Sequence, residues 1–286
     1  MNLHPDLSQA EQRRKAERLR SLHHDAHMLV LPNAWDAASA KMFEQAGFDA
    51  IATTSAGVAT AYGYPDGERM SRAEMLEAVG RIARAVSLPV SADMETGFGD
   101  TPDALAVTAQ LVLEAGAVGL NLEDGTKDAS HPLTDVSLQV EKLKAVRQAA
   151  ERSGVPLVIN ARTDVFVKLD QNDKTRLAQA IQRGNAYHEA GADCIFVFGV
   201  EDREIIARLV REIAAPINIL AHYGSPTIPE LESLGVARVT FGSIPMRATM
   251  SLVGRIAAEL KQAGTYSFAQ GILSYSEANA FFERKK

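Results

Sequence analysis

Cysteine is almost absent from this 286-residue chain, because Cys194 is the only one. A single cysteine cannot form an internal disulfide, and it excludes zinc sites built from several cysteines. No apolar run of about 18 residues occurs, so we expect no membrane-spanning helix. Basic residues are not in excess either, since the net charge is -6. A nucleic-acid-binding protein would show a basic face, so we expect neither a nucleic-acid nor a membrane partner.

The N-terminal stretch also lacks the marks of a targeting signal. Met1 to Arg20 is polar and has no apolar core of the kind found in signal peptides, which predicts a cytoplasmic location. Residues 1–27 contain a polar segment rich in Arg and Glu, along which leucine and alanine recur. This segment is predicted to form an N-terminal helix that caps the domain and keeps one face in solvent.

What the chain does contain is a recurring unit of helix end, glycine and apolar strand. Gly47, Gly116, Gly191 and Gly235 each stand between a helical segment and a short apolar run, and glycine just past a helix is a common stop signal. Proline introduces most of the remaining strands. Together these signals predict eight strands, over residues 28–33, 49–54, 89–93, 118–123, 157–162, 194–198, 217–221 and 238–241.

Eight strand–helix units predict a (β/α)₈ TIM-type barrel that forms one domain over residues 1–286. The strands are short apolar runs, as expected of parallel strands buried on both faces. An open doubly wound sheet is the alternative, but no nucleotide-binding Gly-rich turn follows the first strand. Residues 246–286 form a helical extension longer than one closing helix needs. We expect this extension to cap the barrel or to pack on a neighbouring subunit in a dimeric or tetrameric homo-oligomer.

Acidic residues gather where the predicted strands end, which is the end of such a barrel that carries the chemistry. Asp93 and Glu95 follow the third strand, and Glu123 ends the fourth. Residues two apart on a strand point the same way, so Asp93 and Glu95 are expected to face one site. Like charges held that close are costly unless a cation lies between them or one takes up a proton. A hard divalent cation such as Mg²⁺ is the simplest partner, and a solvated acidic turn is the alternative.

Basic and polar residues at other strand ends point to an anionic ligand. Arg162 ends the fifth strand, and its planar guanidinium suits a carboxylate, although a structural salt bridge to Asp164 or Glu123 is the alternative. After the second strand, the run Thr54-Ser55-Ala56-Gly57 can donate hydroxyl and backbone N–H groups to an oxyanion. Trp35 and Asn121 stand at the ends of the first and fourth strands and are predicted to help bind the substrate.

These motifs, in this order, resemble the isocitrate lyase/phosphoenolpyruvate mutase superfamily. The matching segments are T-S-A-G at 54–57, D-M-E-T-G-F-G at 93–99, N-L-E-D at 121–124 and N-A-R-T-D at 160–164, within a region from about Leu31 to Phe241. The resemblance implies Mg²⁺, with Mn²⁺ as a substitute, surrounded directly or through water by Asp93, Glu95 and Glu123. It also implies that Thr54, Ser55 and Ala56 bind the carboxylate of a 2-oxo acid, and that Arg162, Asp66 and Glu123 are catalytic.

The segment after the L-E-D motif departs from the lyases of this superfamily. Isocitrate and methylisocitrate lyases carry K-K-C-G-H there, with the cysteine as acid/base, whereas Gly125 to Pro132 contains no cysteine. Cys194 is expected to be a core residue. Phosphonopyruvate enzymes place Lys and Asn in this loop, of which only Lys127 is present. Residues 124–135, which hold Gly, Ser and Pro with mixed charges, are predicted to form a lid that excludes water.

The resemblance therefore implies a Mg²⁺-dependent carbon–carbon lyase or decarboxylase. Its substrate is expected to be a small 2-oxo or 2-hydroxy dicarboxylate, of which oxaloacetate is the simplest. A phosphonopyruvate hydrolase, a phosphoenolpyruvate mutase-like enzyme and a non-catalytic 2-oxo acid binding protein are the alternatives. The sequence leaves the proton donor open among several titratable residues: Tyr62, Tyr64, Lys127, His131, His222 and Tyr223.

Overall fold

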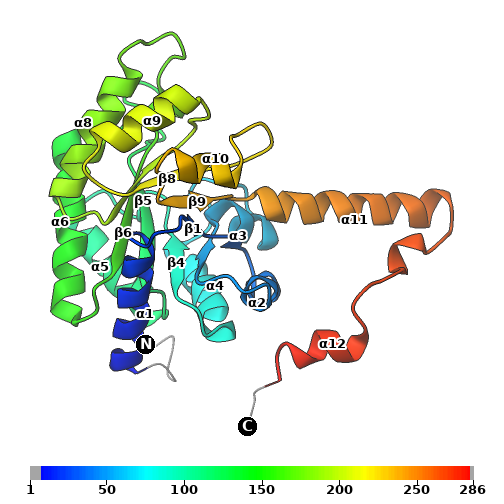
Figure 1. Ribbon diagram of the computed structural model, residues 1–286. Coiled ribbons are helices and arrows are strands. Elements are labelled where there is room, and N and C mark those ends of the chain that lie inside the picture. The colour runs from blue at the N-terminus through cyan, green and yellow to red at the C-terminus, as the bar shows by residue number, and fades with distance from the viewer. Residues whose placement is uncertain (1–7, 284–286) are drawn as a thin grey trace.

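The computed structural model describes residues 8–283, and it confirms the predicted barrel (Figure 1). All strands are parallel and form one curled sheet in the order β1-β9-β8-β7-β6-β5-β4-β3-β2. The strands are β1 (Leu29–Val30), β2 (Asn33–Ala34), β3 (Ile51–Thr53), β4 (Val90–Asp93), β5 (Gly119–Glu123), β6 (Val158–Thr163), β7 (Cys194–Val197), β8 (Ile217–Leu220) and β9 (Arg238–Thr240). Residues 1–7 and 284–286, at the ends of the predicted terminal segments, lie outside the described residues.

The predicted first strand is divided into β1 and β2, and this pair closes the barrel. β1 pairs with β9, whereas β2 pairs with β3. The Leu31 amide donates to the Val239 carbonyl at 2.9 Å, and the Ala52 amide donates to the Pro32 carbonyl at 2.9 Å. Because Pro32 has no amide hydrogen, the ladder is interrupted there although the chain runs on. The nine segments are therefore the eight strands of a closed ring.

Helices surround this ring, as Figure 1 shows. The outer helices are α2 (Ala37–Gln45), α4 (Arg72–Ala85), α5 (Pro102–Glu114), α6 (Val136–Ser153), α8 (Arg176–Glu189), α9 (Arg203–Glu212) and α10 (Ile228–Ser233), and two short helices, α3 (Ser55–Ala61) and α7 (Val165–Lys168), follow β3 and β6 directly. The four glycines predicted to end helices, Gly47, Gly116, Gly191 and Gly235, all have positive φ. Glycine adopts this conformation without the steric cost that other residues meet. At each of these four positions it lets the chain turn from a helix into the next strand.

Helix α1 (Gln9–Leu22) covers the end of the barrel opposite the carboxyl ends of the strands (Figure 1). Its buried stripe is Ala16, Leu19 and Leu22, which recur at the spacing of one helix face. A side chain at Gly119 in β5 would lie 2.8 Å from Leu19, so glycine permits the close approach of helix and strand. The polar face of α1 remains in solvent, apart from ion pairs such as Arg20–Asp193 at 2.9 Å.

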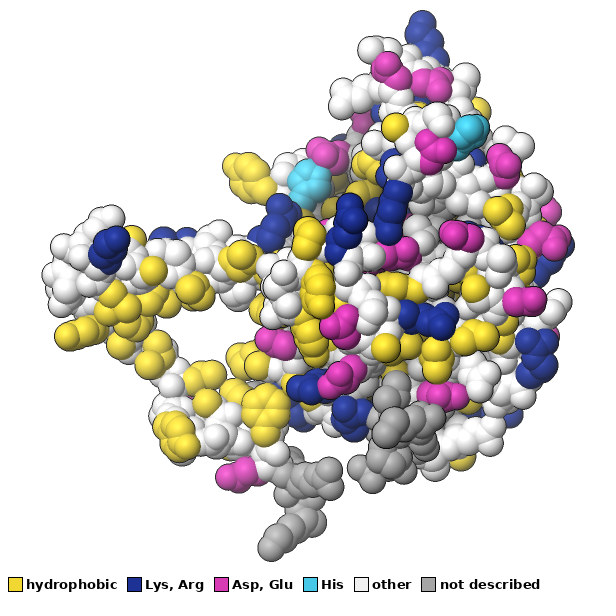
Figure 2. Space-filling model, turned by 180° about the vertical axis from the view of Figure 1, so that it is seen from behind, with side chains coloured by type: hydrophobic (Ala, Val, Ile, Leu, Met, Phe, Trp, Pro, Cys, Tyr) yellow, Lys and Arg dark blue, Asp and Glu magenta, His cyan; other side chains and the backbone are white. Residues whose placement is uncertain are grey.

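The C-terminal arm comprises α11 (Ile244–Gln262), η1 (Ser267–Ala269) and α12 (Tyr275–Ala280). Helix α11 projects away from the barrel instead of packing on it (Figure 1). Within these three helices only Met246 is buried, and Val253 keeps 62% of its surface exposed. Figure 2 shows apolar side chains gathered along this projecting arm. No helix among the described residues is both long and apolar enough to cross a membrane.

Candidate active site

A cavity of about 340 Å³ opens at the carboxyl ends of the strands. Most of the predicted site residues line it: Thr54, Ser55, Ala56, Asp66, Asp93, Asn121 and Arg162. A larger hollow of about 650 Å³ lies beside α1, at the other end of the barrel. Two of its arginines, Arg20 and Arg147, are already paired with Asp193. The smaller cavity is therefore the candidate site, because it alone combines the strand ends with the predicted acids.

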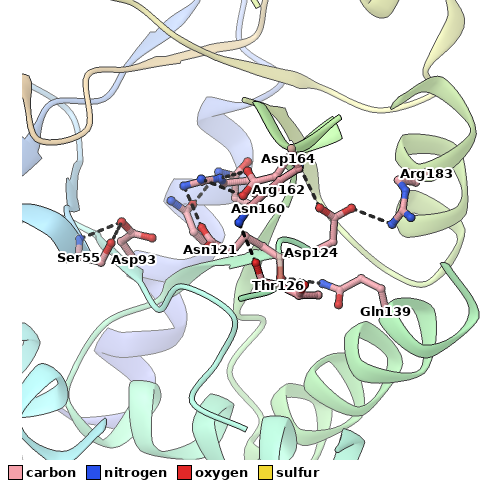
Figure 3. A network of polar contacts seen from close by, with 12 residues as sticks. Ser55, Asp93, Asn121, Asp124, Thr126, Gln139, Asn160, Arg162, Asp164 and Arg183 are labelled. Carbon is pink, nitrogen blue, oxygen red and sulfur yellow. Dashed lines mark hydrogen bonds and ion pairs between the residues drawn. The ribbon is translucent and has the colours of Figure 1, made fainter. Parts of the chain in front are cut away.

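Asp93 is the last residue of β4, and its carboxylate is held by the start of α3 (Figure 3). Its Oδ2 accepts hydrogen bonds from the Ser55 amide at 2.8 Å and the Ser55 hydroxyl at 2.7 Å. No hydrogen bond from the described residues reaches its Oδ1. The donors of Ser55, which were predicted to bind substrate, thus orient Asp93 and leave one carboxylate oxygen available to the cavity.

Glu95 lies on a turn after β4 and not on the strand face of Asp93, from which the shared site of the two acids was predicted. β4 ends at Asp93, and residues 94–97 form a turn in which the Gly97 amide donates to the Met94 carbonyl at 2.8 Å. Glu95 itself has a φ of 52°, outside the extended region in which side chains alternate. Its side chain is buried, and its Oε2 accepts from the Glu68 amide at 2.6 Å.

Three non-glycine residues in the described chain have positive φ, and all three belong to this corner of the site. They are Glu68, Glu95 and Phe98. Glu68 connects them, because its Oε1 accepts from the Phe98 amide at 3.0 Å and from the Thr96 hydroxyl at 2.6 Å. A non-glycine residue with positive φ costs roughly 1–3 kcal/mol of conformational free energy, and such residues tend to cluster at functional sites. Hydrogen bonds between two separate loops hold the strained turn that carries Glu95.

Arg162 pairs with two acids, so the salt-bridge alternative describes its contacts in this structure. The strand register sets Arg162 opposite Glu123, and its Nη1 lies 2.9 Å from Glu123 Oε2. Its Nε and Nη2 donate to the two oxygens of Asp164, at 2.6 and 3.2 Å. The guanidinium also stacks over the Phe198 ring, 3.8 Å from its centroid. Arg162 still lines the cavity, but its charge is already shared between two carboxylates.

A buried network behind Arg162 fixes Asp164 in turn (Figure 3). Asp124 has a fully buried side chain, and its Oδ1 accepts from the Asp164 amide at 2.9 Å. Its Oδ2 lies 3.0 Å from Arg183 and accepts from the Tyr187 hydroxyl at 2.7 Å. Both carboxylate oxygens are satisfied, as a buried charge requires. The network therefore holds the β6–α7 junction against the start of the 124–135 segment.

Asp66, Asp93, Glu95 and Glu123 form what we call the acidic cluster. Burial, together with the charges of Asp93 and Asp66, raises the pKa of Glu95 to about 7. Burial also raises the pKa of Glu123, because the single charge of Arg162 is shared and cannot offset the loss of water. Desolvation and the charge of Asp93 raise the pKa of Asp66. The cluster therefore holds more acid than its one arginine neutralises.

The metal ligands predicted from the resemblance lie in one acidic cluster, but they do not all face the cavity. Among residues 8–283, no three His, Cys, Asp or Glu side chains are close enough to hold one metal ion directly. Glu95 bonds to Glu68 and Glu123 pairs with Arg162, so only Asp93 of the three presents an oxygen to the cavity. Mg²⁺ commonly takes one or two carboxylates and keeps several waters. An oxygen-only cluster with unbalanced negative charge fits such a hydrated ion.

Trp35 does not line the cavity, and its predicted role in substrate binding stays a prediction. It lines a separate apolar hollow together with Met246, Met250 and Val253 at the base of α11. A side chain at Gly57 would lie 3.0 Å from the Trp35 Cβ. Trp35 therefore packs against the first turn of α3 and supports the site from behind.

Of the six predicted proton-donor candidates, only His222 lines the cavity. Its Nε2 lies 2.8 Å from Glu201 Oε1, and its Nδ1 lies 2.8 Å from the Tyr223 carbonyl oxygen. Each ring nitrogen therefore lies within hydrogen-bond distance of an oxygen atom. Lys127 instead lies 3.4 Å from Glu68, a contact that joins the 124–135 segment to the 62–70 loop. Cys194 is fully buried, and burial raises the pKa of its thiol to about 12, as expected of a core residue.

The junction between β9 and α11 is part of the site, although no residue of it was predicted from the sequence. Residues 241–247, which we call the β9–α11 junction, contribute Phe241, Gly242, Ser243, Ile244 and Arg247 to the cavity. The rule that strand ends carry the chemistry could have found this junction, because the eighth predicted strand stops at residue 241.

Comparison with known proteins agrees with this architecture. The family model for phosphoenolpyruvate phosphomutase matches residues 19–261. The chain belongs to this family, within the isocitrate lyase/phosphoenolpyruvate mutase superfamily. Membership confirms the resemblance seen in the motifs and the (β/α)₈ fold that it implied.

Individual relatives span several activities. The chain is 34% identical over 213 residues to oxaloacetate decarboxylase 2 of Pseudomonas fluorescens, covering 72% of this chain and 70% of the relative. It is 30% identical over 260 residues to 2-methylisocitrate lyase of Halalkalibacterium halodurans, covering 89% and 84%. A crystal structure described as a lyase or mutase of Burkholderia cenocepacia superposes with a TM-score of 0.89 at 37% identity, covering 96% and 97%.

Proposed function

We propose that this protein is a Mg²⁺-dependent carbon–carbon lyase or decarboxylase that acts on a small 2-oxo or 2-hydroxy dicarboxylate. One observation carries the proposal: Ser55 orients Asp93 so that one carboxylate oxygen remains available to a cavity beside an under-neutralised acidic cluster. Lyase and decarboxylase relatives of 30 and 34% identity support the reaction class.

The acidic cluster would hold the metal through Asp93 directly and through waters that reach Glu95 and Glu123. Mg²⁺, when bound there, supplies a Lewis acid that polarises the oxo group of the substrate. Asp66 lines the same side of the cavity and adds negative charge. Ser55 keeps Asp93 in one orientation, and Arg162 limits the repulsion within the cluster by pairing with Glu123.

Oxaloacetate illustrates the chemistry in its simplest form. The bond between the third and fourth carbons breaks, CO₂ leaves, and the bonding electron pair stays on the pyruvate fragment. The third carbon must then receive a proton. His222 is the donor candidate that lines the cavity, and Glu201 with the Tyr223 carbonyl can hold its ring in place. No cysteine is needed, which agrees with the burial of Cys194.

A substrate panel tests this proposal. Purified protein with Mg²⁺ would be given oxaloacetate, 2-methylisocitrate, 2,3-dimethylmalate and phosphonopyruvate in separate reactions, with and without EDTA. Pyruvate would be followed with lactate dehydrogenase, and phosphate would be measured in parallel. We expect pyruvate or another 2-oxo acid from a carbon diacid, abolished by EDTA.

Two other results would overturn the proposal. Release of phosphate from phosphonopyruvate alone would assign the protein to carbon–phosphorus chemistry. Binding of oxalate with Mg²⁺ and no turnover of any compound would favour the 2-oxo acid binding protein.

We also propose that the chain works as a homo-oligomer joined through its C-terminal arm. Helix α11 leaves the barrel with Met250, Val253 and Leu260 exposed, and an apolar hollow lies at its base. A second copy of the chain would cover these side chains. Light scattering should give a dimer or tetramer, and Val253→Glu should lower the assembly state. A wild-type monomer at micromolar concentration would refute this proposal.

A further inference from the structure

The acidic cluster and the β9–α11 junction stand on opposite sides of the cavity. In the closed ring of eight strands, β9 lies opposite β5, which carries Glu123. The acids that line the cavity, Asp93 and Asp66, come from β4 and the loop after α3, whereas Arg247 reaches the cavity from the first turn of α11. The two sides therefore present opposite charge to a bound molecule.

Arg247 differs from the other arginine of the cavity because none of the described residues pairs with it. Arg162 is paired with Glu123 and Asp164. In the part of the chain that the structure describes, the Arg247 guanidinium makes no hydrogen bond, ion pair or ring contact, and the residue is exposed. An arginine that lines an acid-containing cavity without pairing to its acids keeps its full charge for a ligand.

The backbone that leads to Arg247 is held in place, although the Arg247 side chain makes no contact of this kind with the described residues. The Asn33 side chain accepts from the Phe241 and Gly242 amides at 2.8 and 3.0 Å, and it donates to the Thr53 carbonyl at 2.9 Å. Gly242 has a φ of 53°, so the chain turns sharply there from β9 into α11. The helix starts at Ile244 with its N-terminal end beside the cavity, and that end favours negative charge.

We infer that Arg247 is a specificity-determining residue that binds the distal carboxylate of the substrate. The inference rests on the proposed function, in which the 2-oxo or 2-hydroxy acid end lies at the acidic cluster. The second carboxylate then lies across the cavity, where the planar guanidinium can donate two parallel hydrogen bonds. Arg247 thereby selects dicarboxylates over the matching monocarboxylates and leaves Arg162 to balance the acids.

Malate and lactate form a matched pair for the test, because they share the 2-hydroxy acid end and differ by one carboxylate. Titration calorimetry with Mg²⁺ would measure both ligands, together with oxalate, which has no distal group. Wild type should bind malate more tightly than lactate. Arg247→Gln should weaken malate binding by about 10- to 100-fold, the range for a hydrogen bond to a charged group. Lactate and oxalate binding should stay unchanged.

Two variants complete the design. Arg247→Lys should fall between wild type and Arg247→Gln, because an ammonium group cannot make the paired contact of a guanidinium. Arg255→Gln removes the same charge from the exposed face of the same helix and does not touch the cavity. Arg255→Gln should bind all three ligands like wild type, which separates a local contact from a general charge effect.

Each outcome decides between the two proposals. If Arg247→Gln keeps the wild-type preference for malate over lactate, Arg247 does not bind the distal carboxylate, while the proposed function stands. Equal weakening of all three ligands would assign Arg247 to the structure of the site and also overturn the inference. If wild type with Mg²⁺ binds none of the three, the proposed function itself fails, and the inference fails with it.

Discussion

The two sides of the cavity are built in contrasting ways. In the acidic cluster, Asp93, Glu95 and Glu123 each have a protein partner, and hydrogen bonds with Glu68 hold the strained turn that carries Glu95. At the β9–α11 junction the backbone is anchored by Asn33, but the Arg247 side chain has no partner among residues 8–283. Rigid side chains suit a fixed charge arrangement needed for chemistry. A free arginine suits recognition of the part of the substrate that does not react.

Loss of the Asp93 carboxylate should have the largest effect. Asp93→Asn keeps the shape but removes the charge that would bind Mg²⁺, so kcat should fall on the order of 10³-fold. Steady-state assays of the substrate identified in the panel would measure this. Asp100→Asn, an exposed acid in the same loop, is the control and should retain wild-type activity. Full activity in Asp93→Asn would remove the acidic cluster from the mechanism.

Ser55→Ala tests whether the held orientation of Asp93 matters. The variant loses the hydroxyl bond to Asp93 but keeps the amide bond. We expect kcat/KM to fall by about tenfold, a typical loss for one hydrogen bond to a charged group. Mg²⁺ affinity should weaken in parallel, because a less constrained carboxylate binds less well. An unchanged Mg²⁺ titration would show that Ser55 serves only to begin α3.

The unbalanced acids should make stability depend on pH and on Mg²⁺. Burial raises the pKa of Glu95 from 4.5 to about 7. Below pH 4.5 both folded and unfolded chains hold this proton, but between these values only the folded chain keeps it. Without metal, the contribution of Glu95 to stability is therefore lost as pH rises through about 7.

Thermal melting at pH 5.5 and pH 8, with and without Mg²⁺, would measure this dependence. Saturating Mg²⁺ should raise Tm by about 5 °C at pH 8 and by less at pH 5.5, where protons compete with the metal. Ca²⁺ at equal ionic strength controls for general salt effects. An equal Mg²⁺ shift at both pH values would contradict the assignment of the excess charge to these carboxyls.

Trp35 provides the smallest expected effect, because it belongs to neither side of the cavity. Trp35→Phe keeps an aromatic ring in the hollow beside Met246 and Met250, so KM should change by less than about twofold. Stability should drop by about 1 kcal/mol from the smaller apolar volume. Steady-state kinetics would measure the change in KM, and denaturant unfolding would measure the change in stability. A large rise in KM with no loss of stability would instead support the substrate-binding role predicted from the sequence.

The local pattern of residues was enough to predict the strands and most of the cavity. Buried parallel strands leave a strong signal, since each is a short apolar run bounded by glycine or proline. Their carboxyl ends meet at one rim by the geometry of the barrel. Thr54, Ser55, Ala56, Asp93, Asn121 and Arg162 therefore line the cavity, and Asp66, which only the resemblance implied, lines it as well.

What the sequence determined by itself is the barrel and the identity of the acids at its rim, because both follow from short-range periodicity. Only the tertiary structure decided how those acids are held. Glu95 does not lie on the strand face, because the Glu68 amide, from another loop, donates to its carboxylate while Glu95 has a positive φ. Trp35 lines a separate hollow because the start of α11 lies beside it, and the same position of α11 brings Arg247 to the cavity. Loop conformation depends on partners far along the chain, which no local pattern encodes.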